Sequence, residues 1–195
     1  WSKESLFAVG GLMKHAEALT SITCSTVNSY NGLVPRVGGF EGGTVTWAPT
    51  NITYGHNNRS AQFRLPQNRY CIENRAADMT MNVYLAFSMT LAAAVEGIKM
   101  KIHPGKPTDQ DLYEMTDKEF KKLGIKRLPR NLLMALEALK NDKLSDEVIG
   151  TVMKKSLLAY KNDEWERYHQ AVTDWEVKEY LRPVSYTHLT LPTIE

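Results

Sequence analysis

Between Leu6 and Ser21, apolar side chains recur at every third or fourth position, as on one face of a helix. The series is Leu6, Val9, Leu12, Met13, Ala16 and Leu19. We therefore predict one amphipathic helix over Leu6–Ser21. Residues 26–43 are rich in glycine and also contain Asn28 and Pro35. This density of turn-forming residues predicts a long loop, and long loops in compact domains are usually functional.

Four short apolar runs after this loop predict β-strands. Each run is bounded by Pro, Gly or Asn, which end strands and form the tight turns between antiparallel neighbours. The predicted strands span Thr44–Trp47, Ile52–Tyr54, Ala61–Leu65 and Tyr70–Asn74. Their close succession along the chain predicts a mainly antiparallel sheet.

The rest of the chain has the apolar period of helices. One apolar stripe extends over about five turns, through Tyr84, Phe87, Leu91, Ala94, Ile98 and Ile102. The small residues at 92–94 predict that this helix packs closely onto the sheet.

Several signals for helix starts divide the C-terminal half. Thr116 and Thr173 each precede a glutamate by three positions, which is the pattern of a capping box. Pro129 suits the first position of a helix carrying Leu132–Leu139, and Ser145 begins a predicted long helix that continues to Tyr168. The order of helix, loop, strands and then helices predicts an α+β fold.

Composition and charge exclude several classes of protein. A chain of 195 residues with 43% hydrophobic and 24% charged residues is ordinary for one globular domain. The formal charge of +2 is too small to indicate a nucleic acid or an anionic membrane as partner. No uninterrupted apolar run reaches the ~18 residues of a membrane span. Cys24 and Cys71 form no metal-binding pattern, which favours a reducing, cytoplasmic location.

The two ends of the sequence differ from its middle. The chain starts at Trp1 with a helical pattern that no other element precedes, and we interpret it as a truncated piece. Residues 184–194 contain no Asp, Glu, Lys or Arg and follow a helix that we expect to stop before Pro183. We therefore divide the chain into a domain at residues 1–183 and a non-native tail at residues 184–195. The alternative is that the tail is a native terminal strand.

The densest group of unusual polar residues lies among the predicted strands. Arg59, Arg64, Arg69 and Arg75 fall within seventeen positions, with Glu73 between the last two. Alternate residues of a strand share a face, so Glu73 and Arg75 are expected to point the same way. A carboxylate can hold a hard divalent cation, and guanidinium groups bind phosphate oxygens as a planar fork. The pattern thus favours a metal–nucleotide site, and a solvated strand face with incidental ion pairs is the alternative.

An ordered set of short motifs resembles the glutamine synthetase family. The motifs are Asn28-Ser29-Tyr30, Asn58-Arg59-Ser60-Ala61 with Arg64-Leu65-Pro66, Ile72-Glu73-Asn74-Arg75 and Asn82-Val83-Tyr84-Leu85. The segment Gly10–Ala16 also looks like the family's GGLLKHA helix. The likeness covers Leu6–Leu181, and it implies a curved, mainly antiparallel sheet followed by a helical C-terminal region, as part of the family's catalytic domain.

The resemblance implies a role for each residue of the group. Glu73 occupies the position of a metal ligand, and Arg59 that of the arginine that stabilises the transferring phosphoryl group. Arg64 corresponds to an arginine that binds nucleotide phosphates, and Arg75 to one that faces the glutamate γ-carboxylate. Arg69 lies near the place of a further phosphate arginine, where this sequence has Cys71.

The loop after Asn28-Ser29-Tyr30 departs from the family pattern. Asn31-Gly32 stands where the family usually has Lys-Arg, whose arginine binds the substrate α-carboxylate. Arg36 is the candidate to replace it, and Glu41 is the candidate for the family's catalytic flap glutamate. Ordinary solvated loop charges are the alternative for both residues.

The implied activity is ATP-dependent ligation of ammonia to glutamate through a γ-glutamyl phosphate, with Mg²⁺ or Mn²⁺ as cofactor. The implied partners are glutamate, ATP, ammonia or a small amine, and further copies of the chain in a ring-shaped, dodecamer-like homo-oligomer. The altered loop leaves a larger amine, such as methylamine or a polyamine, as an alternative acceptor. A non-catalytic relative with an assembly or regulatory role is the alternative of another class. The piece itself is expected to be inactive.

Overall fold

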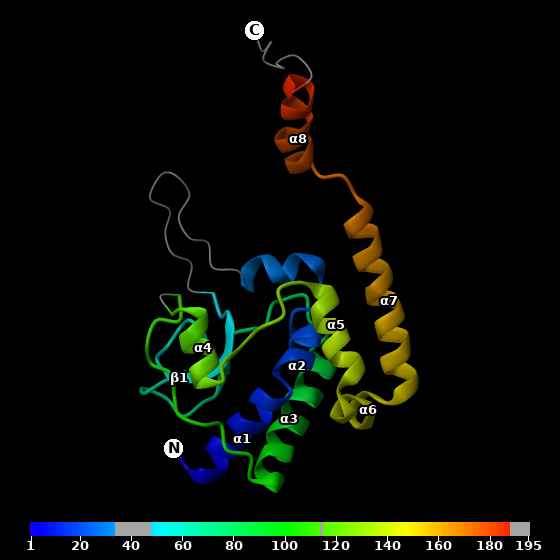
Figure 1. Ribbon diagram of the computed structural model, residues 1–195. Helices are drawn as coiled ribbons and strands as arrows, with labels where there is room; N and C mark the ends of the chain where they lie inside the picture. Colours follow the sequence, from blue (N-terminus) through cyan, green and yellow to red (C-terminus); the bar gives the residue numbers. More distant parts are fainter. Residues whose placement is uncertain (34–47, 114, 188–195) are drawn as a thin grey trace.

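A computed structural model describes residues 1–33, 48–113 and 115–187. In it a group of packed helices lies beside a small sheet, and the last helix extends away from both (Figure 1). The predicted strand Thr44–Trp47, together with Arg36 and Glu41, lies outside the described residues.

The predicted N-terminal helix is divided in two. Helix α1 spans Lys3–Lys14 and helix α2 spans Ala16–Thr23. The prediction of one continuous helix was wrong at His15, whose backbone (φ −99°, ψ 10°) departs from helical geometry. The side chain of His15 is buried between two carboxylates of distant segments, and these contacts hold the break. A 3₁₀ helix, η1 (Val27–Leu33), follows and contains Asn28-Ser29-Tyr30.

The sheet contains four strands in the order β3-β2-β1-β4. Their bounds are Asn51–His56 for β1, Ala61–Leu65 for β2, Glu73–Asn74 for β3 and Lys126–Arg127 for β4. Strands β2 and β3 pair antiparallel, as do β1 and β4, whereas β1 and β2 run parallel. The mainly antiparallel α+β fold is thereby confirmed, although Tyr70–Ile72 of the predicted strand Tyr70–Asn74 lie outside β3.

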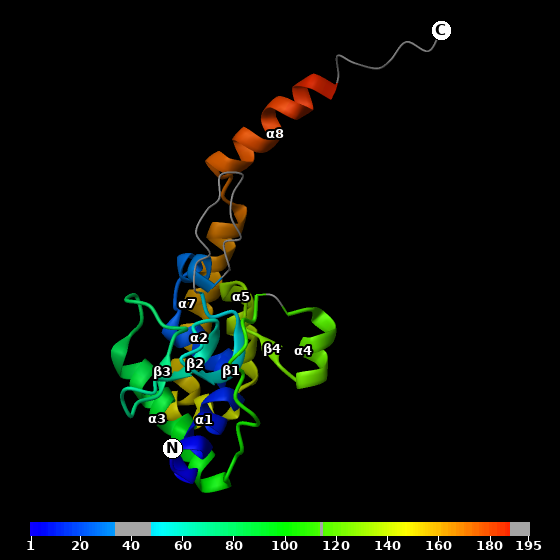
Figure 2. The same cartoon turned by 90° about the vertical axis from the view of Figure 1, so that its left-hand side faces the viewer.

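Helix α3 (Val83–Met100) crosses α1 through small residues (Figure 2). A Cβ atom added at Gly11 would overlap the Ala93 carbonyl oxygen, and one at Gly97 would overlap the Phe7 carbonyl oxygen. The expected packing of residues 92–94 onto the sheet was therefore wrong, because Ala93 packs against α1. Most of the predicted apolar stripe is exposed, namely Tyr84, Phe87, Leu91 and Ile98.

The C-terminal part consists largely of helices. They are α4 (Asp117–Leu123), α5 (Leu132–Asn141), α6 (Lys143–Ile149), α7 (Thr151–Gln170) and α8 (Asp174–Thr187). The Thr116–Glu119 capping box is present, and Thr173 makes the same reciprocal hydrogen bonds with Glu176. Both capping predictions are thus confirmed.

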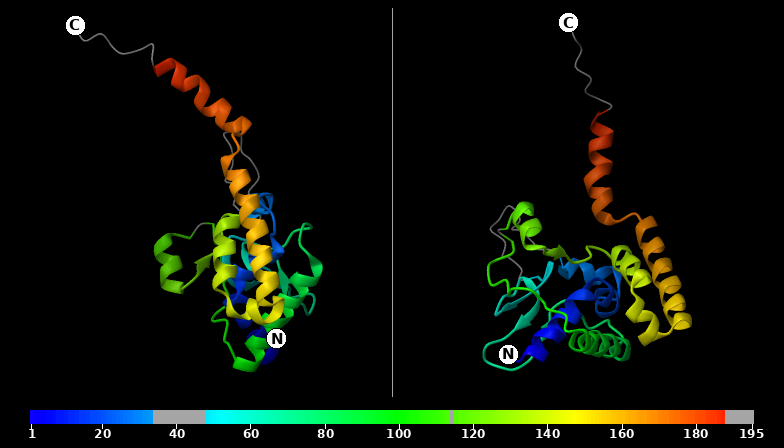
Figure 3. Two further views of the ribbon diagram at one scale, coloured as in Figure 1. Left: turned by 90° about the vertical axis from the view of Figure 1, so that its right-hand side faces the viewer. Right: turned by 60° about the horizontal axis from the view of Figure 1, so that its bottom comes forward.

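Three predicted helix boundaries in this region were wrong. Asn131, not Pro129, precedes α5, because the Asn131 side chain accepts a hydrogen bond from the Met134 N–H and caps the helix. Gly150, with φ 83°, separates α6 from α7 where one helix was expected. Helix α8 continues through Pro183 to Thr187. In all views of the chain, α8 extends beyond α7, away from the sheet (Figure 3).

The main core lies between α2, α5 and the sheet. Leu19, Phe63, Leu132, Leu136 and Leu139 are among its fully buried side chains. Burial of such side chains stabilises the fold by roughly 1.5–3 kcal/mol each. This core holds β1 and β2 in place, and β2 with its neighbour β3 carries the candidate site.

Of the described helices, α3 alone has the length and apolar composition of a membrane span. That finding is weak, since the core helix of a water-soluble protein passes the same test. Its close contact with α1 through Gly11 and Gly97 gives it a packing role within the domain.

Candidate active site

Strand pairing brings the acidic residue of the predicted group opposite one of its arginines. Strands β2 and β3 pair antiparallel with Arg64 opposite Glu73 and Phe63 opposite Asn74. The Arg75 N–H donates to the Gln62 carbonyl at 2.8 Å, which extends the pairing by one residue. Directly opposed side chains of an antiparallel pair lie on the same face, so local pairing alone sets Glu73 against Arg64.

Three guanidinium groups surround the Glu73 carboxylate. Arg64 Nη1 and Arg69 Nη2 each lie 3.0 Å from Glu73 Oε2, and Arg75 Nε lies 3.5 Å from Oε1. Three positive charges and one negative charge leave the cluster with a surplus of positive charge. Arg64 and Arg75 are 19% and 18% exposed, whereas Arg69 is 60% exposed. We name Arg64, Arg69, Glu73 and Arg75 the arginine cluster.

The motif Asn58-Arg59-Ser60-Ala61 holds Arg59 beside this cluster. Asn58 is buried and donates to the carbonyls of Thr108 and Gln110 at 2.7 and 2.9 Å. Its Oδ1 accepts hydrogen bonds from the Ser60 backbone N–H and hydroxyl group. The buried residues on either side thus anchor a short segment whose middle residue, Arg59, is exposed.

The pKa of Arg75 is lowered by its surroundings, which include other positive charges. Burial lowers the pKa of Arg75, and Arg59 and Arg64 lower it further, while Glu73 and Tyr113 oppose the shift. An arginine remains charged at any ordinary pH. Bringing these cations together therefore costs free energy that a bound anion would offset.

Polar groups without partners lie in the same strand. The Gln62 side chain is fully buried, and both of its amide atoms lack a hydrogen-bond partner among the described residues. Arg64 Nε is also buried without such a partner there. Unsatisfied buried polar groups are rare in native proteins, and sequence patterns gave no sign that Gln62 would be one of them.

The described residues do not form a complete metal site. Glu73 offers the oxygen donors that a hard divalent cation prefers. Within the described ranges, however, no group of three or more His, Cys, Asp or Glu side chains could hold an ion. Glu73 fits one ligand of a shared site, and the other ligands would come from outside these ranges.

His15 belongs to a second charged group that the sequence did not predict. Its Nε2 lies 2.6 Å from Glu96, and its Nδ1 lies 2.5 Å from Asp142. Lys14 bonds Glu96 at 2.9 Å, and buried Lys154 donates to the Asp142 carbonyl at 2.8 Å. The pKa of His15 is raised: burial lowers it, but the hydrogen bonds that its ring donates to the carboxylates of Asp142 and Glu96 outweigh burial. The partners of His15 lie 81 and 127 positions away along the chain, so local sequence patterns give no sign of them.

The sequence profile of the family described as "Glutamine synthetase, catalytic domain" matches residues 1–180. The chain belongs to the glutamine synthetase family. This confirms the resemblance inferred from the motifs.

Similarity to individual proteins supports this assignment. A glutamine synthetase from Methanocaldococcus jannaschii is 40% identical over 183 residues, which cover 92% of this chain and 38% of the relative. A glutamate–methylamine ligase from Methyloversatilis universalis is 42% identical over 180 residues, covering 92% and 39%. The chain therefore spans less than half the length of these glutamine synthetase family members.

Two solved structures also share the fold. A structure of GmaS in complex with ADP superposes with a TM-score of 0.79 at 34% identity, over 93% of this chain and 40% of that chain. A structure of GmaS without ligand gives a TM-score of 0.74 at 32% identity.

Proposed function

We propose that this chain supplies the arginine-rich part of the active site of an ATP-dependent glutamate–amine ligase. The observation that carries the proposal is the arginine cluster itself, because Arg64, Glu73 and Arg75 stand in the motifs that resemble those of the family and Arg69 contacts the same carboxylate. The length of the relatives supports the further proposal that the chain is part of a longer protein that is inactive without its remaining part.

The proposed chemistry begins with transfer of the ATP γ-phosphoryl group to the glutamate side-chain carboxylate. Ammonia or an amine then attacks the acyl phosphate and releases phosphate. Arg59 stabilises the transferring phosphoryl group, and Arg64 and Arg69 bind phosphate oxygens of the nucleotide. Arg75 faces the γ-carboxylate. Fixed cations suit this reaction because several anionic groups crowd one site, and preorganised donors of this kind contribute roughly 3–4 kcal/mol each.

A divalent ion, Mg²⁺ or Mn²⁺, belongs to the proposal as a cofactor. When bound, it would neutralise phosphate charge. Glu73 would provide one of its ligands. Binding of phosphate oxygens by Arg64 and Arg69 would at the same time release the Glu73 carboxylate from its present ion pairs.

Ammonia is the leading acceptor and methylamine is the second candidate. The similarity to glutamate–methylamine ligase of Methyloversatilis universalis favours the second candidate. Gly32 also stands where the family usually has an arginine for the substrate α-carboxylate, and its surroundings are open. We propose Arg36 as the substitute cation and Glu41 as the group that accepts a proton from the amine. A cytoplasmic, ring-shaped homo-oligomer remains part of the proposal, and a non-catalytic relative is the competing one.

The decisive experiment replaces the charge at the centre of the arginine cluster. In the full-length protein, Glu73→Gln should reduce ATP-dependent phosphate release by about a hundredfold or more. Glu166→Gln on the exposed side of α7 serves as the matched control and should leave release unchanged. Phosphate release by the Glu73→Gln variant at the level of the control would support the non-catalytic relative.

The acceptor is identified by comparing amines in the same assay. Phosphate release with ATP and glutamate is measured with ammonium, methylamine, ethanolamine and putrescine, before and after Arg36→Ala. We expect Arg36→Ala to raise the KM for glutamate about tenfold or more, since a lost charge-assisted hydrogen bond costs about 1.5–3 kcal/mol. Unchanged glutamate affinity in this variant, with ammonium clearly the best acceptor, would contradict our interpretation of the loop.

A further inference from the structure

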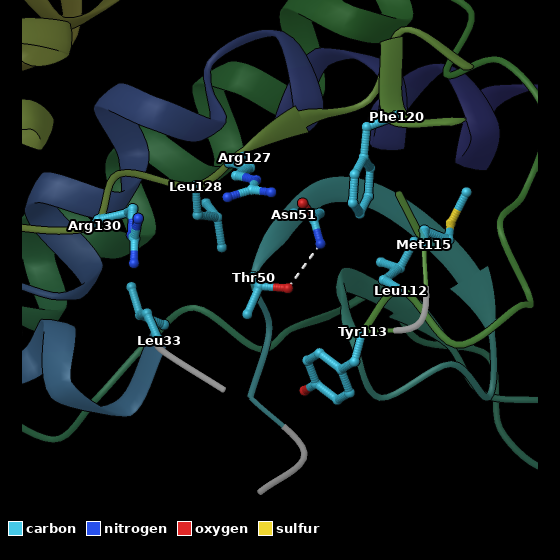
Figure 4. A pocket seen from close by; sticks show the side chains of 10 residues that line it. All are labelled: Leu33, Thr50, Asn51, Leu112, Tyr113, Met115, Phe120, Arg127, Leu128 and Arg130. Atoms are coloured by element: carbon cyan, nitrogen blue, oxygen red, sulfur yellow. Dashed lines mark hydrogen bonds between the residues drawn. The ribbon is translucent and has the colours of Figure 1, made fainter. Parts of the chain in front are cut away.

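A cavity of about 260 Å³ lies between the end of η1, strand β1 and the segment around α4. Its lining includes Leu33, Asn51, Tyr113, Phe120, Arg127 and Arg130, whose side chains surround a common space (Figure 4). None of these residues belongs to the arginine cluster. The volume is at the small end for ligand sites, so any occupant has to be about the size of one substituted ring.

Asn51 leaves a buried polar atom at this cavity. The residue is only 3% exposed. Its Nδ2 donates to Thr50 Oγ1 at 2.7 Å, whereas its Oδ1 has no hydrogen-bond partner among the described residues. Rotating the amide by 180° would still leave one amide atom without a partner. The Thr50 hydroxyl group would then donate to Oδ1, and Nδ2 would have no acceptor. A buried acceptor of this kind calls for a donor on a bound molecule.

Two guanidinium groups, those of Arg127 and Arg130, line the cavity. Strands β1 and β4 pair Asn51 directly with Arg127, so both side chains lie on one face of the sheet. The Arg127 guanidinium also lies over the Phe120 ring, 5.8 Å from its centroid. Arg130 lines the opposite side beside Leu33 (Figure 4). The positive charge of Arg130 at this side of the cavity favours an anionic occupant.

The remaining walls are apolar or aromatic. Leu112, Met115 and Leu128 join Leu33 and Phe120 in the lining. The Tyr113 hydroxyl group donates to the Ala48 carbonyl. Burial raises the pKa of Tyr113, so the residue stays neutral and presents its ring to the cavity. These walls suit a flat apolar body, and they disfavour a strongly polar dicarboxylate such as glutamate.

We infer that this cavity binds a small organic carboxylate with a ring-sized apolar body and one hydrogen-bond donor. The carboxylate pairs with Arg130 at the Leu33 side, the ring lies against Tyr113 and Phe120, and the donor group bonds Asn51 Oδ1. The inference depends only on described residues of this chain and is independent of the ligase reaction.

Three matched probes test this assignment by titration calorimetry on the 195-residue chain. They are 3-hydroxybenzoate, benzoate, which lacks the donor, and 3-hydroxybenzamide, which lacks the charge. We expect 3-hydroxybenzoate to bind at least about tenfold more tightly than either of the others. Equal affinity for all three probes would overturn the inference. Glutamate that binds competitively and as tightly as 3-hydroxybenzoate would overturn it too, since the cavity would then belong to the substrate site.

Two variants assign the contacts to residues. Arg130→Gln should weaken 3-hydroxybenzoate about tenfold and remove its advantage over the benzamide. Arg167→Gln, at an exposed position of α7, makes the same change in net charge. This variant should bind 3-hydroxybenzoate as tightly as the wild type and should keep its preference over the benzamide. Asn51→Leu, which conserves the side-chain volume, should make 3-hydroxybenzoate bind no more tightly than benzoate. The variant should keep the preference of 3-hydroxybenzoate over the benzamide. Arg130 is exposed, so its replacement should leave the fold intact. Unchanged binding by Arg130→Gln therefore contradicts the assignment even if Asn51→Leu fails to fold.

Discussion

Glu73 accepts hydrogen bonds from two arginines and contacts a third, and the geometry of these contacts depends on the planar guanidinium group. Lysine carries the same charge as arginine but cannot form a planar, two-pronged contact with phosphate oxygens. Charge and shape can therefore be separated by replacing individual arginines with lysine.

At Arg59 we expect shape to matter as much as charge. In the full-length protein, Arg59→Lys should reduce ATP-dependent phosphate release nearly as much as Arg59→Ala, and by about a hundredfold. The activity of Arg69→Lys is measured for comparison, because the Arg69 side chain is 60% exposed and contacts Glu73 at the surface of the protein. If Arg59→Lys retains most of the activity, Arg59 is a peripheral charge.

At His15 we expect a pH-dependent contribution to stability. The folded state raises the pKa of His15 above the ordinary histidine value of 6.5. Its protonated form therefore stabilises the fold fully below about pH 6.5. This contribution is lost as the pH rises through the folded-state pKa. The pKa values of Glu96 and Asp142 are lowered in the folded state, so their contribution is lost only as the pH falls through those lower values.

Urea denaturation of the 195-residue chain between pH 5 and pH 9 measures the effect. The free energy of unfolding of the wild-type chain should fall across the upper part of this range. His15→Asn should remove this pH dependence, even if the variant is less stable than the wild type at every pH. His169→Asn, on exposed α7, is the control and should keep the wild-type slope. A wild-type slope in His15→Asn would show that another group causes it.

At the scale of elements, the crossing of α1 and α3 depends on the absence of side chains. Gly11 and Gly97 meet at a distance that leaves no room for a methyl group on either helix. Helix α3 consequently buries Ala86, Met89, Ala93 and Gly97, and its large apolar side chains are exposed. Close approach of the two backbones thus decides which face of α3 is buried.

Replacing Gly11 should separate the two helices. Gly11→Ala puts a methyl group into the backbone of α3, and overpacking of this kind costs about 1–3 kcal/mol. Gly32→Ala is the matched control, since no atom lies within 4 Å of the added methyl group, and its effect should stay within about 0.5 kcal/mol. Chemical denaturation of both variants gives the comparison, and equal stability would mean that α1 and α3 pack less closely than described.

At the scale of the whole molecule, α8 contributes little to the packed body. The helix extends beyond α7 (Figure 3), and its large apolar residues Trp175, Val177, Tyr180 and Leu181 are exposed. The division of the chain at residue 183 stays a prediction, because α8 continues through Pro183 to Thr187.

Deleting residues 184–195 should therefore leave the free energy of unfolding within about 0.5 kcal/mol of the intact chain. Thermal and urea denaturation of the shortened chain measure this difference. Deletion of residues 174–195, which also removes α8, shows how much the helix itself contributes. A loss of stability on removing 184–195 alone would indicate a native, packed terminus.

Sequence by itself determined the features that depend on neighbouring residues. The bounds of β2 follow from five residues, Ala61–Leu65, and both capping boxes follow from a threonine and a glutamate three positions apart. The arginine cluster also was foreseeable in part, because Arg64 and Glu73 lie on strands that are joined by a short connection. Motif order was sufficient to indicate the family.

Tertiary structure decided what depends on segments far apart in the chain. His15 meets Asp142 across 127 positions, and Asn51 faces Arg127 through the pairing of β1 with β4. Periodicity could show that α3 has an apolar face, but only the contact of Gly97 with Gly11 decided that its small-residue face is buried. Local patterns carry no information about such contacts, because the folded backbone alone determines which distant residues become neighbours.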